Sequence, residues 1–305
     1  MTLLKRILYR IMARRPEPGA AAFRPASDIS ICLCGDFMLD RRIEPYLSHG
    51  GLMYPFKNLF PLLAEYDIRA LNLETPISDK PGKKHPGKKF NFQAPGYIAR
   101  ILARAGIGYV SLSNNHILDF GAEVAKDTVQ NLNKYGIRSS GLSFAKNPAV
   151  IELNGYKIAF LSFMDGECLP NGFEKTASVW GMGATTEIKT AAKKADLVIV
   201  AMHWGTELAK SADNRQRQIA RKIIDAGADV VWGHHPHVIQ ETERYKDGVI
   251  FYSLGNFIFS HLTPSITRGM VAGIHIKDGK IADISKHIIN NDNYRVHYAP
   301  IVTSE

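Results

Sequence analysis

The sequence predicts an α/β fold that includes some antiparallel strands. Short apolar segments rich in β-branched residues alternate with segments of helical periodicity, the pattern of strands buried on both faces. Asn154-Gly155 and Asp278-Gly279 each separate two apolar runs and predict β-hairpins. A hydrophobic fraction of 45% and a charged fraction of 22% are typical of a globular protein rather than a disordered or fibrous one.

The elements follow one another without a long interruption. Strands are expected at 29–35, 68–73, 107–113, 157–163, 196–202, 228–232 and 249–254. Helices are expected at 95–105, 122–135 and 213–226, because each carries apolar residues at helical spacing and is followed by glycine, the usual residue past a helix end. Since no internal repeat is evident, we predict one domain at 29–305 after an N-terminal extension and linker at 1–28.

The N-terminal extension is basic and amphipathic. Leu4, Ile7, Leu8 and Ile11 recur at helical spacing, with lysines and arginines on the other positions. This pattern indicates a short helix at a membrane surface, and the alternatives are a frayed extension or a helix packed on the domain. No signal peptide or transmembrane segment is evident, so we expect a cytoplasmic or peripheral membrane location.

A formal net charge of +9 predicts an anionic partner, such as a phosphate compound, a polymer or a membrane surface. No run of basic residues alternates with aromatic ones, so we expect no nucleic-acid binding. The chain has three cysteines, and this small, odd number argues against a disulfide framework. Cys32 and Cys34 are expected as buried thiols on the strand face that carries Asp36, with metal ligation as the alternative.

Five expected strands end in side chains that can bind a metal: Asp36, Glu74, Asn115, His203 and the run Gly233-His234-His235-Pro236-His237. Ligands bind outside the carboxyl ends of strands in open α/β sheets, so these side chains are expected on one rim. Nitrogen and oxygen ligands without cysteine are typical of catalytic sites. The set suits one or two divalent ions, and zinc, manganese and iron would all serve.

Most of these residues also have a structural interpretation when each is taken alone. Asp36 could cap a turn, Glu74 could begin one, and His203 could be a buried imidazole with a satisfied hydrogen bond. The histidines at 234, 235 and 237 are harder to explain by packing, because proline stiffens the turn that holds them together.

Three further features lie near these strand ends. The basic loop at 80–90 predicts either a solvated surface or a mobile clamp for an anionic substrate, the clamp using Lys83, Lys84, Lys88 and Lys89. Asn256 ends another apolar run and could bind a ligand or fix the tautomer of a histidine. Glu207 could orient His203 in the same way.

The chain resembles a known family in six blocks: Gly35-Asp36, Asn72-Leu73-Glu74, Ser113-Asn114-Asn115-His116 with Asp119-Phe120-Gly121, His203-Trp204-Gly205-Thr206-Glu207, Gly233 to Val238, and Ser253-Leu254-Gly255-Asn256-Phe257. In order from about 29 to 260, these blocks resemble the CapA/PgsA family, named for poly-γ-glutamate capsule synthesis. That family is similar to the calcineurin-like metallophosphoesterases. The resemblance therefore implies a four-layer α/β/β/α sandwich with mixed sheets and a metal centre at the strand ends.

The resemblance also implies roles for the residues at the rim. Asp36 and His237 would bind a first ion, Glu74 would bridge two ions, and Asn115, His203 and His235 would bind the second. His116 would donate a proton to the leaving group. His234 has no firm counterpart in the family, and it could relay a proton or shape the turn. Met38 stands where the phosphoesterase pattern has a histidine, so one ion and two ions are both open.

Two functions follow from this resemblance. The first is a metal-dependent hydrolase, acting on a phosphate ester or by variation an amide, in the synthesis of a capsule, poly-γ-glutamate or another extracellular polymer. The second is a non-catalytic assembly factor that binds an anionic polymer or a membrane-bound synthase.

Overall fold

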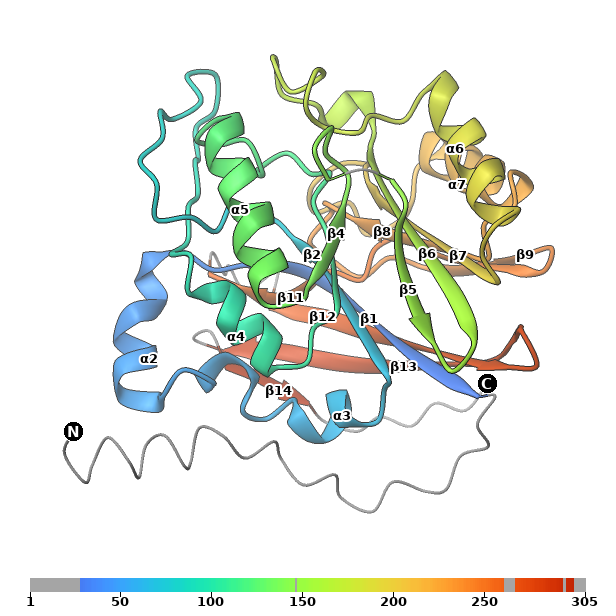
Figure 1. Ribbon diagram of the computed structural model, residues 1–305, viewed down its shortest axis with the longest axis horizontal. Helices are drawn as coiled ribbons and strands as arrows, with labels where there is room; N and C mark the ends of the chain where they lie inside the picture. Colours follow the sequence, from blue (N-terminus) through green and yellow to red (C-terminus); the bar gives the residue numbers. More distant parts are fainter. Residues whose placement is uncertain (1–27, 146, 261–266, 293–294, 299–305) are drawn as a thin grey trace.

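The computed structural model describes residues 28–145, 147–260, 267–292 and 295–298, which are coloured in Figure 1. The predicted interfacial helix therefore lies outside the described residues. Two β-sheets pack face to face, with helices on both outer sides (Figure 1). Among the helices that are described, none is long and apolar enough to cross a membrane.

The first sheet has eight strands in the order β14-β13-β12-β1-β2-β3-β4, and β11 also pairs with β1. The strands β1 to β4 are parallel, whereas β12 to β14 are antiparallel. Their bounds are β1 (Ile29–Met38), β2 (Ile68–Leu73), β3 (Tyr109–Ser111), β4 (Arg138–Ser140), β11 (Asn256–Phe259), β12 (Arg268–Lys277), β13 (Lys280–Asp292) and β14 (Arg295–Tyr298).

The second sheet has six strands in the order β5-β6-β7-β8-β10-β9. Its inner strands are parallel, and β5 and β9 close its edges in the antiparallel sense. The bounds are β5 (Ala149–Leu153), β6 (Tyr156–Met164), β7 (Leu197–His203), β8 (Val230–His234), β9 (Thr242–Tyr245) and β10 (Gly248–Phe251). Both predicted hairpins are confirmed, as the β5–β6 and β12–β13 pairs.

The helices form the two outer layers. The first sheet is covered by α2 (Glu44–Gly50), α3 (Phe60–Ala64), α4 (Ile98–Arg104) and α5 (Ala122–Lys134), and the second by α6 (Met182–Ala192) and α7 (Asn214–Asp225). Short 3₁₀ turns are η1 (Arg41–Ile43), η2 (Tyr54–Phe56) and η3 (Gly166–Cys168). Helices α2, α3 and α6 were not expected; the first two have only seven and five residues.

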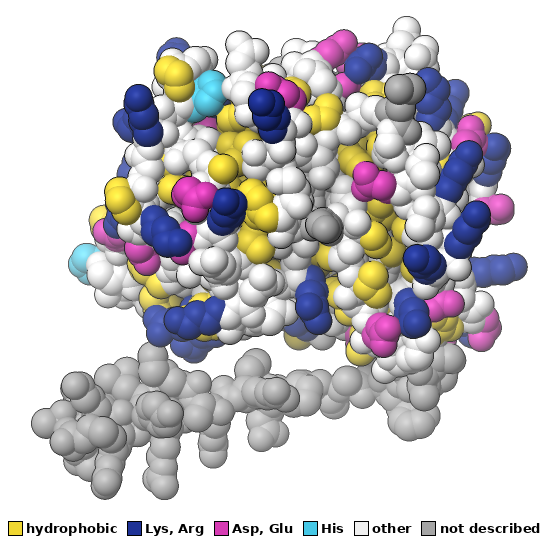
Figure 2. Space-filling model, turned by 45° about the horizontal axis from the view of Figure 1, so that its top comes forward, with side chains coloured by type: hydrophobic (Ala, Val, Ile, Leu, Met, Phe, Trp, Pro, Cys, Tyr) yellow, Lys and Arg dark blue, Asp and Glu magenta, His cyan; other side chains and the backbone are white. Residues whose placement is uncertain are grey.

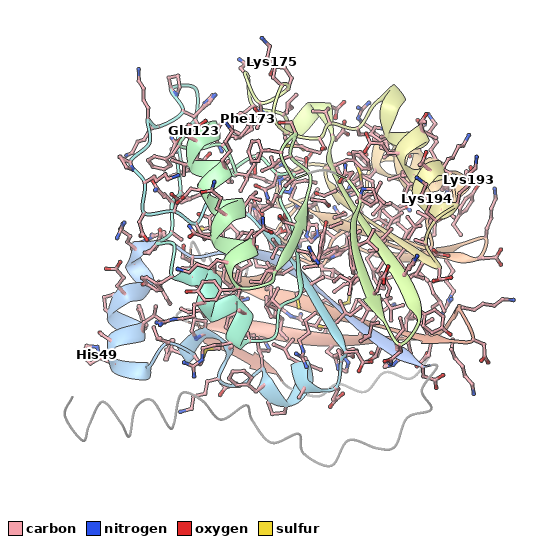
Figure 3. The ribbon with its side chains drawn as sticks, viewed as in Figure 1. His49, Glu123, Phe173, Lys175, Lys193 and Lys194 are labelled. Carbon is pink, nitrogen blue, oxygen red and sulfur yellow. The ribbon has the colours of Figure 1, made fainter. Side chains whose placement is uncertain are left out.

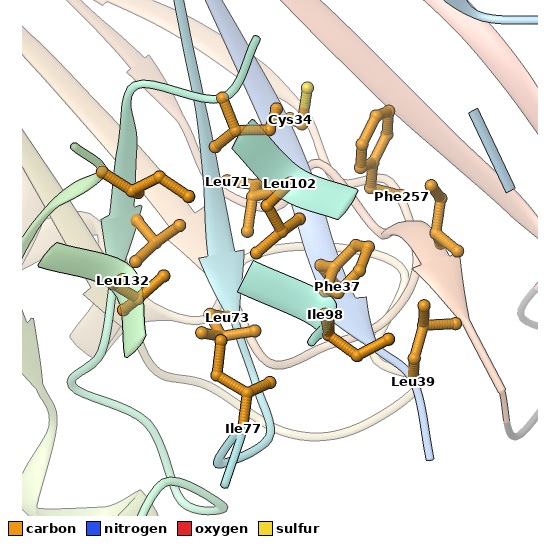
Figure 4. Packing of buried hydrophobic residues seen from close by; sticks show 14 of the residues in the cluster. Cys34, Phe37, Leu39, Leu71, Leu73, Ile77, Ile98, Leu102, Leu132 and Phe257 are labelled. Carbon is orange, nitrogen blue, oxygen red and sulfur yellow. The ribbon is translucent and has the colours of Figure 1, made fainter. Parts of the chain in front are cut away.

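Three separate apolar clusters mark the interfaces between the four layers. One lies between the first sheet and its helices, where Phe37 lies beside Ile98 and Leu71 beside Leu102 (Figure 4). A second fills the space between the sheets and includes Leu33 and Trp232. The third lies between the second sheet and helices α6 and α7. These clusters confirm the predicted α/β/β/α sandwich with mixed sheets.

A β-bulge in β1 corrects the prediction that Asp36 shares a face with Cys32 and Cys34. The step from 33 to 36 on β1 is matched by the step from 70 to 72 on β2, so β1 carries one extra residue there. Cys34 consequently packs toward the helices, whereas Asp36 contacts His234 of the opposite sheet.

We predict that Gly35→Ala destabilises the protein. A Cβ at Gly35 would lie 1.9 Å from the carbonyl oxygen of Gly255, a backbone atom that cannot move without shifting β11. Overpacking of this kind costs about 1–3 kcal/mol in the free energy of unfolding, measurable by urea denaturation. Gly183→Ala in α6 is the control, because a Cβ there meets nothing within 4 Å and should leave stability equal or slightly higher. Equal midpoints for Gly35→Ala and the wild type would contradict the close approach.

Candidate metal centre

Asp36 is wholly buried where the two sheets meet. Its Oδ1 accepts hydrogen bonds from Nδ1 of His234 at 2.8 Å and from Nδ2 of Asn72 at 2.9 Å. Its Oδ2 lies 3.3 Å from the amide nitrogen of His235 and 3.2 Å from Nδ1 of His237. Burial alone would raise the pKa of this carboxyl, but hydrogen bonds from the two imidazoles hold the pKa well below its usual value. Asp36 is therefore an ionised anchor for the histidine-rich turn.

Glu74 follows β2 and lies at the centre of the group. Its Oε2 accepts a hydrogen bond from Asn72 at 3.2 Å, whereas its buried Oε1 has no hydrogen-bond partner among the described residues. That oxygen lies 3.6 Å from Nε2 of His237 and 3.9 Å from Nε2 of His203. Burial, followed by the charge of Asp36, raises the pKa of Glu74 well above its usual value. A carboxylate oxygen between two imidazoles is well placed to bind a cation.

The turn after β8 brings two imidazoles to this carboxylate. Glu74, His235 and His237 each offer one ligand atom, and these atoms lie within 4.8 Å of one another. His235 and His237 have φ values of 96° and 58°, which are uncommon for residues other than glycine and typical of functional sites. Nδ1 of His237 donates to Oδ1 of Asn256 at 2.9 Å, which leaves Nε2 as the nitrogen that can bind a cation once its own proton is released.

His203 and Asn115 complete the rim. Nε2 of His203 lies 3.2 Å from Oδ1 of Asn115, and the His203 and His235 rings are 4.6 Å apart between centroids. Burial lowers the pKa of both histidines, that of His235 to about 3. Both imidazoles are therefore neutral, which is the form that binds metals.

The residues present fit a divalent cation. Ligand atoms 3–4 Å apart are what an ion with bonds of about 2.0–2.2 Å to nitrogen and oxygen requires. Four buried atoms at this rim have no hydrogen-bond partner within the described residues: Glu74 Oε1, His203 Nδ1, His234 Nε2 and His235 Nδ1. Such atoms lower stability unless a ligand satisfies them.

Two details bear on the number of ions. Met38 occupies the position where the phosphoesterase pattern has a histidine ligand. Its side chain is buried, and its sulfur accepts a hydrogen bond from the Ser260 hydroxyl at 2.9 Å. Both oxygens of Asp36 already hold histidine and asparagine side chains. Direct binding of a metal ion by Asp36, and the presence of a second ion, therefore stay predictions.

The predicted proton donor lies on the turn after β3. Nδ1 of His116 is 2.7 Å from Oδ2 of Asp119, a carboxylate that is itself wholly buried. With Nδ1 bonded, Nε2 is the nitrogen left to exchange a proton. His234 differs, since its ring is anchored to Asp36.

Two predictions about surrounding residues are wrong. Lys83, Lys84 and Lys89 are exposed as expected of a clamp, but the side chain of Lys88 is only 12% exposed and is paired with Asp119. Glu207 is exposed, and the predicted hydrogen bond to His203 is not formed, because Nε2 of His203 contacts Asn115 and its Nδ1 has no partner in the described part of the chain.

Asn72, Asn114 and Asp119 were not predicted as site residues. Asn72 joins Asp36 to Glu74, and Asn114 holds Asn72 through a 3.1 Å hydrogen bond. Asn72 could have been found from its position two residues before Glu74, which places both on one face of the strand. Asn114 and Asp119 act through the geometry of a loop, for which strand periodicity carries no signal.

Comparisons with known proteins identify the family of this chain. The family model described as bacterial capsule synthesis protein PGA_cap matches residues 30–261. The chain is 35% identical over 260 residues to the PGA biosynthesis protein CapA of Bacillus subtilis, covering 82% of this chain and 68% of the relative. It is 31% identical over 275 residues to the capsule biosynthesis protein CapA of Bacillus anthracis, covering 85% and 66%. The chain thus spans about two thirds of the length of these curated relatives.

A solved structure shows the same fold. The crystal structure of a hypothetical protein from Thermus thermophilus matches with a TM-score of 0.58 at 16% identity, covering 87% of this chain and all of that one (100%).

We predict that Asp36→Asn weakens divalent-metal binding. The amide cannot accept hydrogen bonds at both atoms, so His234 or the His235 backbone loses its anchor. Loss of such a supporting group lowers metal affinity roughly 10- to 100-fold, measurable by titration calorimetry with Zn²⁺ or Mn²⁺. Asp225→Asn, at an exposed ion pair with Lys246, is the matched control and should bind metal normally. Unchanged affinity in Asp36→Asn would show that this carboxylate does not support the site.

We also predict that the metal-free protein loses stability as the pH rises. Burial alone would lower the pKa of His237, but Glu74 and Asp36 raise it from 6.5 to about 9. Because the folded-state pKa exceeds the unfolded one, this stabilisation is complete below about pH 6.5 and is lost as the pH approaches 9. The urea midpoint of chelator-treated protein should fall across this window, and His237→Gln should flatten the fall. A rising wild-type midpoint would contradict this assignment.

Proposed function

Because the chain belongs to the family of bacterial capsule synthesis proteins, we propose that it is a metal-dependent hydrolase of phosphate esters that serves the synthesis of a capsule, poly-γ-glutamate or another extracellular polymer. The observation that carries the proposal is Oε1 of Glu74. This buried oxygen has no hydrogen-bond partner among the described residues and lies between Nε2 of His203 and Nε2 of His237.

Each residue at the rim has a distinct task in this reaction. Glu74, His235 and His237 would hold a divalent ion, which when bound supplies activation of water and neutralisation of charge at phosphorus. Asp36 and Asn256 fix the imidazoles so that the ligand atoms converge.

The leaving oxygen needs a proton, and His116 is placed to supply it. Asp119 holds the Nδ1 hydrogen, so Nε2 is the nitrogen that would take up a proton from solvent and, as the imidazolium, pass it to that oxygen. Zinc, manganese and iron all suit the nitrogen and oxygen ligands of this site.

The substrate is proposed to be anionic. Lys83, Lys84 and Lys89 are exposed on the loop that follows Glu74, and the chain has a net charge of +9. On the face drawn in Figure 2, basic side chains are spread among acidic ones rather than gathered in one patch. Attraction near the site would therefore come from this loop. Contact of the N-terminal segment with a membrane surface, or with a membrane-bound synthase, belongs to the same proposal.

A second function is favoured by one observation. Met38 places a thioether, bonded to Ser260, where the phosphoesterase pattern has an imidazole. With that ligand missing, the chain could hold an ion for structure alone and act as an assembly factor that binds an anionic polymer or a synthase.

Metal analysis combined with an assay separates the two functions. We predict that purified protein contains a divalent metal and hydrolyses p-nitrophenyl phosphate or its diester analogue. His235→Ala should lose at least about 100-fold in kcat/KM, together with metal. His49→Ala is the matched control, because this exposed histidine lies at the end of α2 (Figure 3) and its ring contacts the carbonyl of Pro45 in the same helix.

The outcomes point in different directions. Bound metal without turnover of any phosphoryl or amide substrate would favour the assembly factor. Full metal content in both His203→Ala and His235→Ala would show that the ligand set is wrong.

A further inference from the structure

The ammonium group of Lys88 is buried beside the proposed proton donor rather than exposed to substrate. It donates hydrogen bonds to the backbone carbonyl of Asn115 and to Oδ1 of Asp119, and it lies 3.0 Å from Nδ1 of His116. The Lys88 side chain is only 12% exposed, whereas the neighbouring Lys89 is exposed. Its hydrogen bonds to Asn115 and Asp119 thus fix this lysine to the turn after β3, unlike the exposed lysines of the loop.

The hydrogen bonds around His116 fix its tautomer. Its Nδ1 lies 2.7 Å from Oδ2 of Asp119, and a carboxylate only accepts while an ammonium only donates. Nδ1 cannot donate to the carboxylate and accept from the ammonium at once. Its shorter contact is the one with Asp119, so we assign the hydrogen to Nδ1 and the ammonium hydrogens to Asn115 and Asp119. Lys88 contributes by binding the other oxygen of the same carboxylate, which it neutralises and holds in place.

Lys88 reaches this position because its loop packs against the turn that carries Asp119. The amide of His85 donates to the carbonyl of Asp119, and the amide of Phe92 donates to its Oδ2, both at 2.8 Å. Phe92 also packs against His116, with ring centroids 4.7 Å apart. The loop and the turn are thus one packed unit at this point.

The same loop contacts a segment that follows β6 of the second sheet. Nε2 of His85 lies 2.9 Å from the carbonyl oxygen of Asn171, and Phe173 packs against the His85 ring and lies 5.9 Å from the Lys88 ammonium. Asn171 and Phe173 belong to the segment after β6, and Figure 3 shows Phe173 at the end of the molecule where α5 begins. The 80–92 loop, which follows β2 of the first sheet, therefore contacts the segment after β6 of the second sheet beside the site.

We infer that Lys88 is a positioning residue. When the 80–92 loop packs against the turn after β3, Lys88 fixes the Asn115 backbone and the Asp119–His116 pair relative to each other. Its kinetic consequence rests on the proposed hydrolase function. One cation thereby fixes both a residue proposed to bind metal and the residue proposed to donate the proton. Substrate attraction is left to the exposed lysines of the loop.

The test compares two single lysines of the loop in the full chain. Lys88→Met keeps the apolar stem and removes the charge, Lys88→Arg keeps the charge, and Lys89→Met removes the same charge from an exposed neighbour. With metal-loaded protein and p-nitrophenyl phosphate, Lys88→Met should lower kcat roughly 10- to 100-fold with little change in KM. Lys88→Arg should recover part of kcat, and Lys89→Met should raise KM alone. A rise in KM alone for Lys88→Met would overturn the inference.

A spectroscopic measurement decides the inference even when no substrate turns over. The Nδ1 hydrogen of His116 should give a low-field proton NMR resonance, assigned by its absence in His116→Gln. We expect this resonance in wild type and Lys89→Met, and its loss through exchange with water in Lys88→Met. Its retention in Lys88→Met would show that Lys88 does not hold the pair. Absence of turnover in wild type with loss of the resonance in Lys88→Met would contradict the hydrolase function alone.

Discussion

A single buried carboxylate joins the two sheets at the candidate site. Asp36, on β1 of the first sheet, binds the ring of His234 and the backbone of His235 at the end of β8 in the second. An ion removed from water lowers stability by several kcal/mol unless it is paired and hydrogen-bonded. The two sheets must therefore meet with this register, and the same turn then carries His235 and His237 to Glu74.

The sheets and the loops contribute different parts of the site. Strand ends supply the side chains that converge around Glu74, and these are rigid because the strands are packed on both faces. Loops supply His116 and the lysines. The contact of His85 with Asn171 shows that the loops of the two halves also meet, so access to the site depends on segments that are more easily displaced than the strands.

The strand ends could be predicted because their signal is local. Apolar runs ending at Glu74, His203 and His234 indicate where parallel strands stop, and the topology of an α/β sheet brings those ends together. The direction of Asp36 could not be predicted, because the bulge near Gly35 depends on close contact with Gly255, which is distant in sequence.

The burial of the loop residues could not be predicted from the sequence either. Lys88 and Lys89 are adjacent and chemically identical, yet one is buried against Asp119 and the other is exposed. Only tertiary packing separates them. Glu207 likewise follows His203 closely along the chain but does not bond it, since Asn115, on the turn after β3, contacts that ring.

Anomalous X-ray scattering from crystals loaded with manganese or zinc tests the account most directly. Data collected above the absorption edge of the metal would locate each ion without assumptions about activity. We expect a peak bonded to Glu74, His235 and His237, with Asp36 directly behind it. Fully loaded protein with no peak at these residues, or with its only peak elsewhere, would contradict the existence of a metal centre at the strand ends.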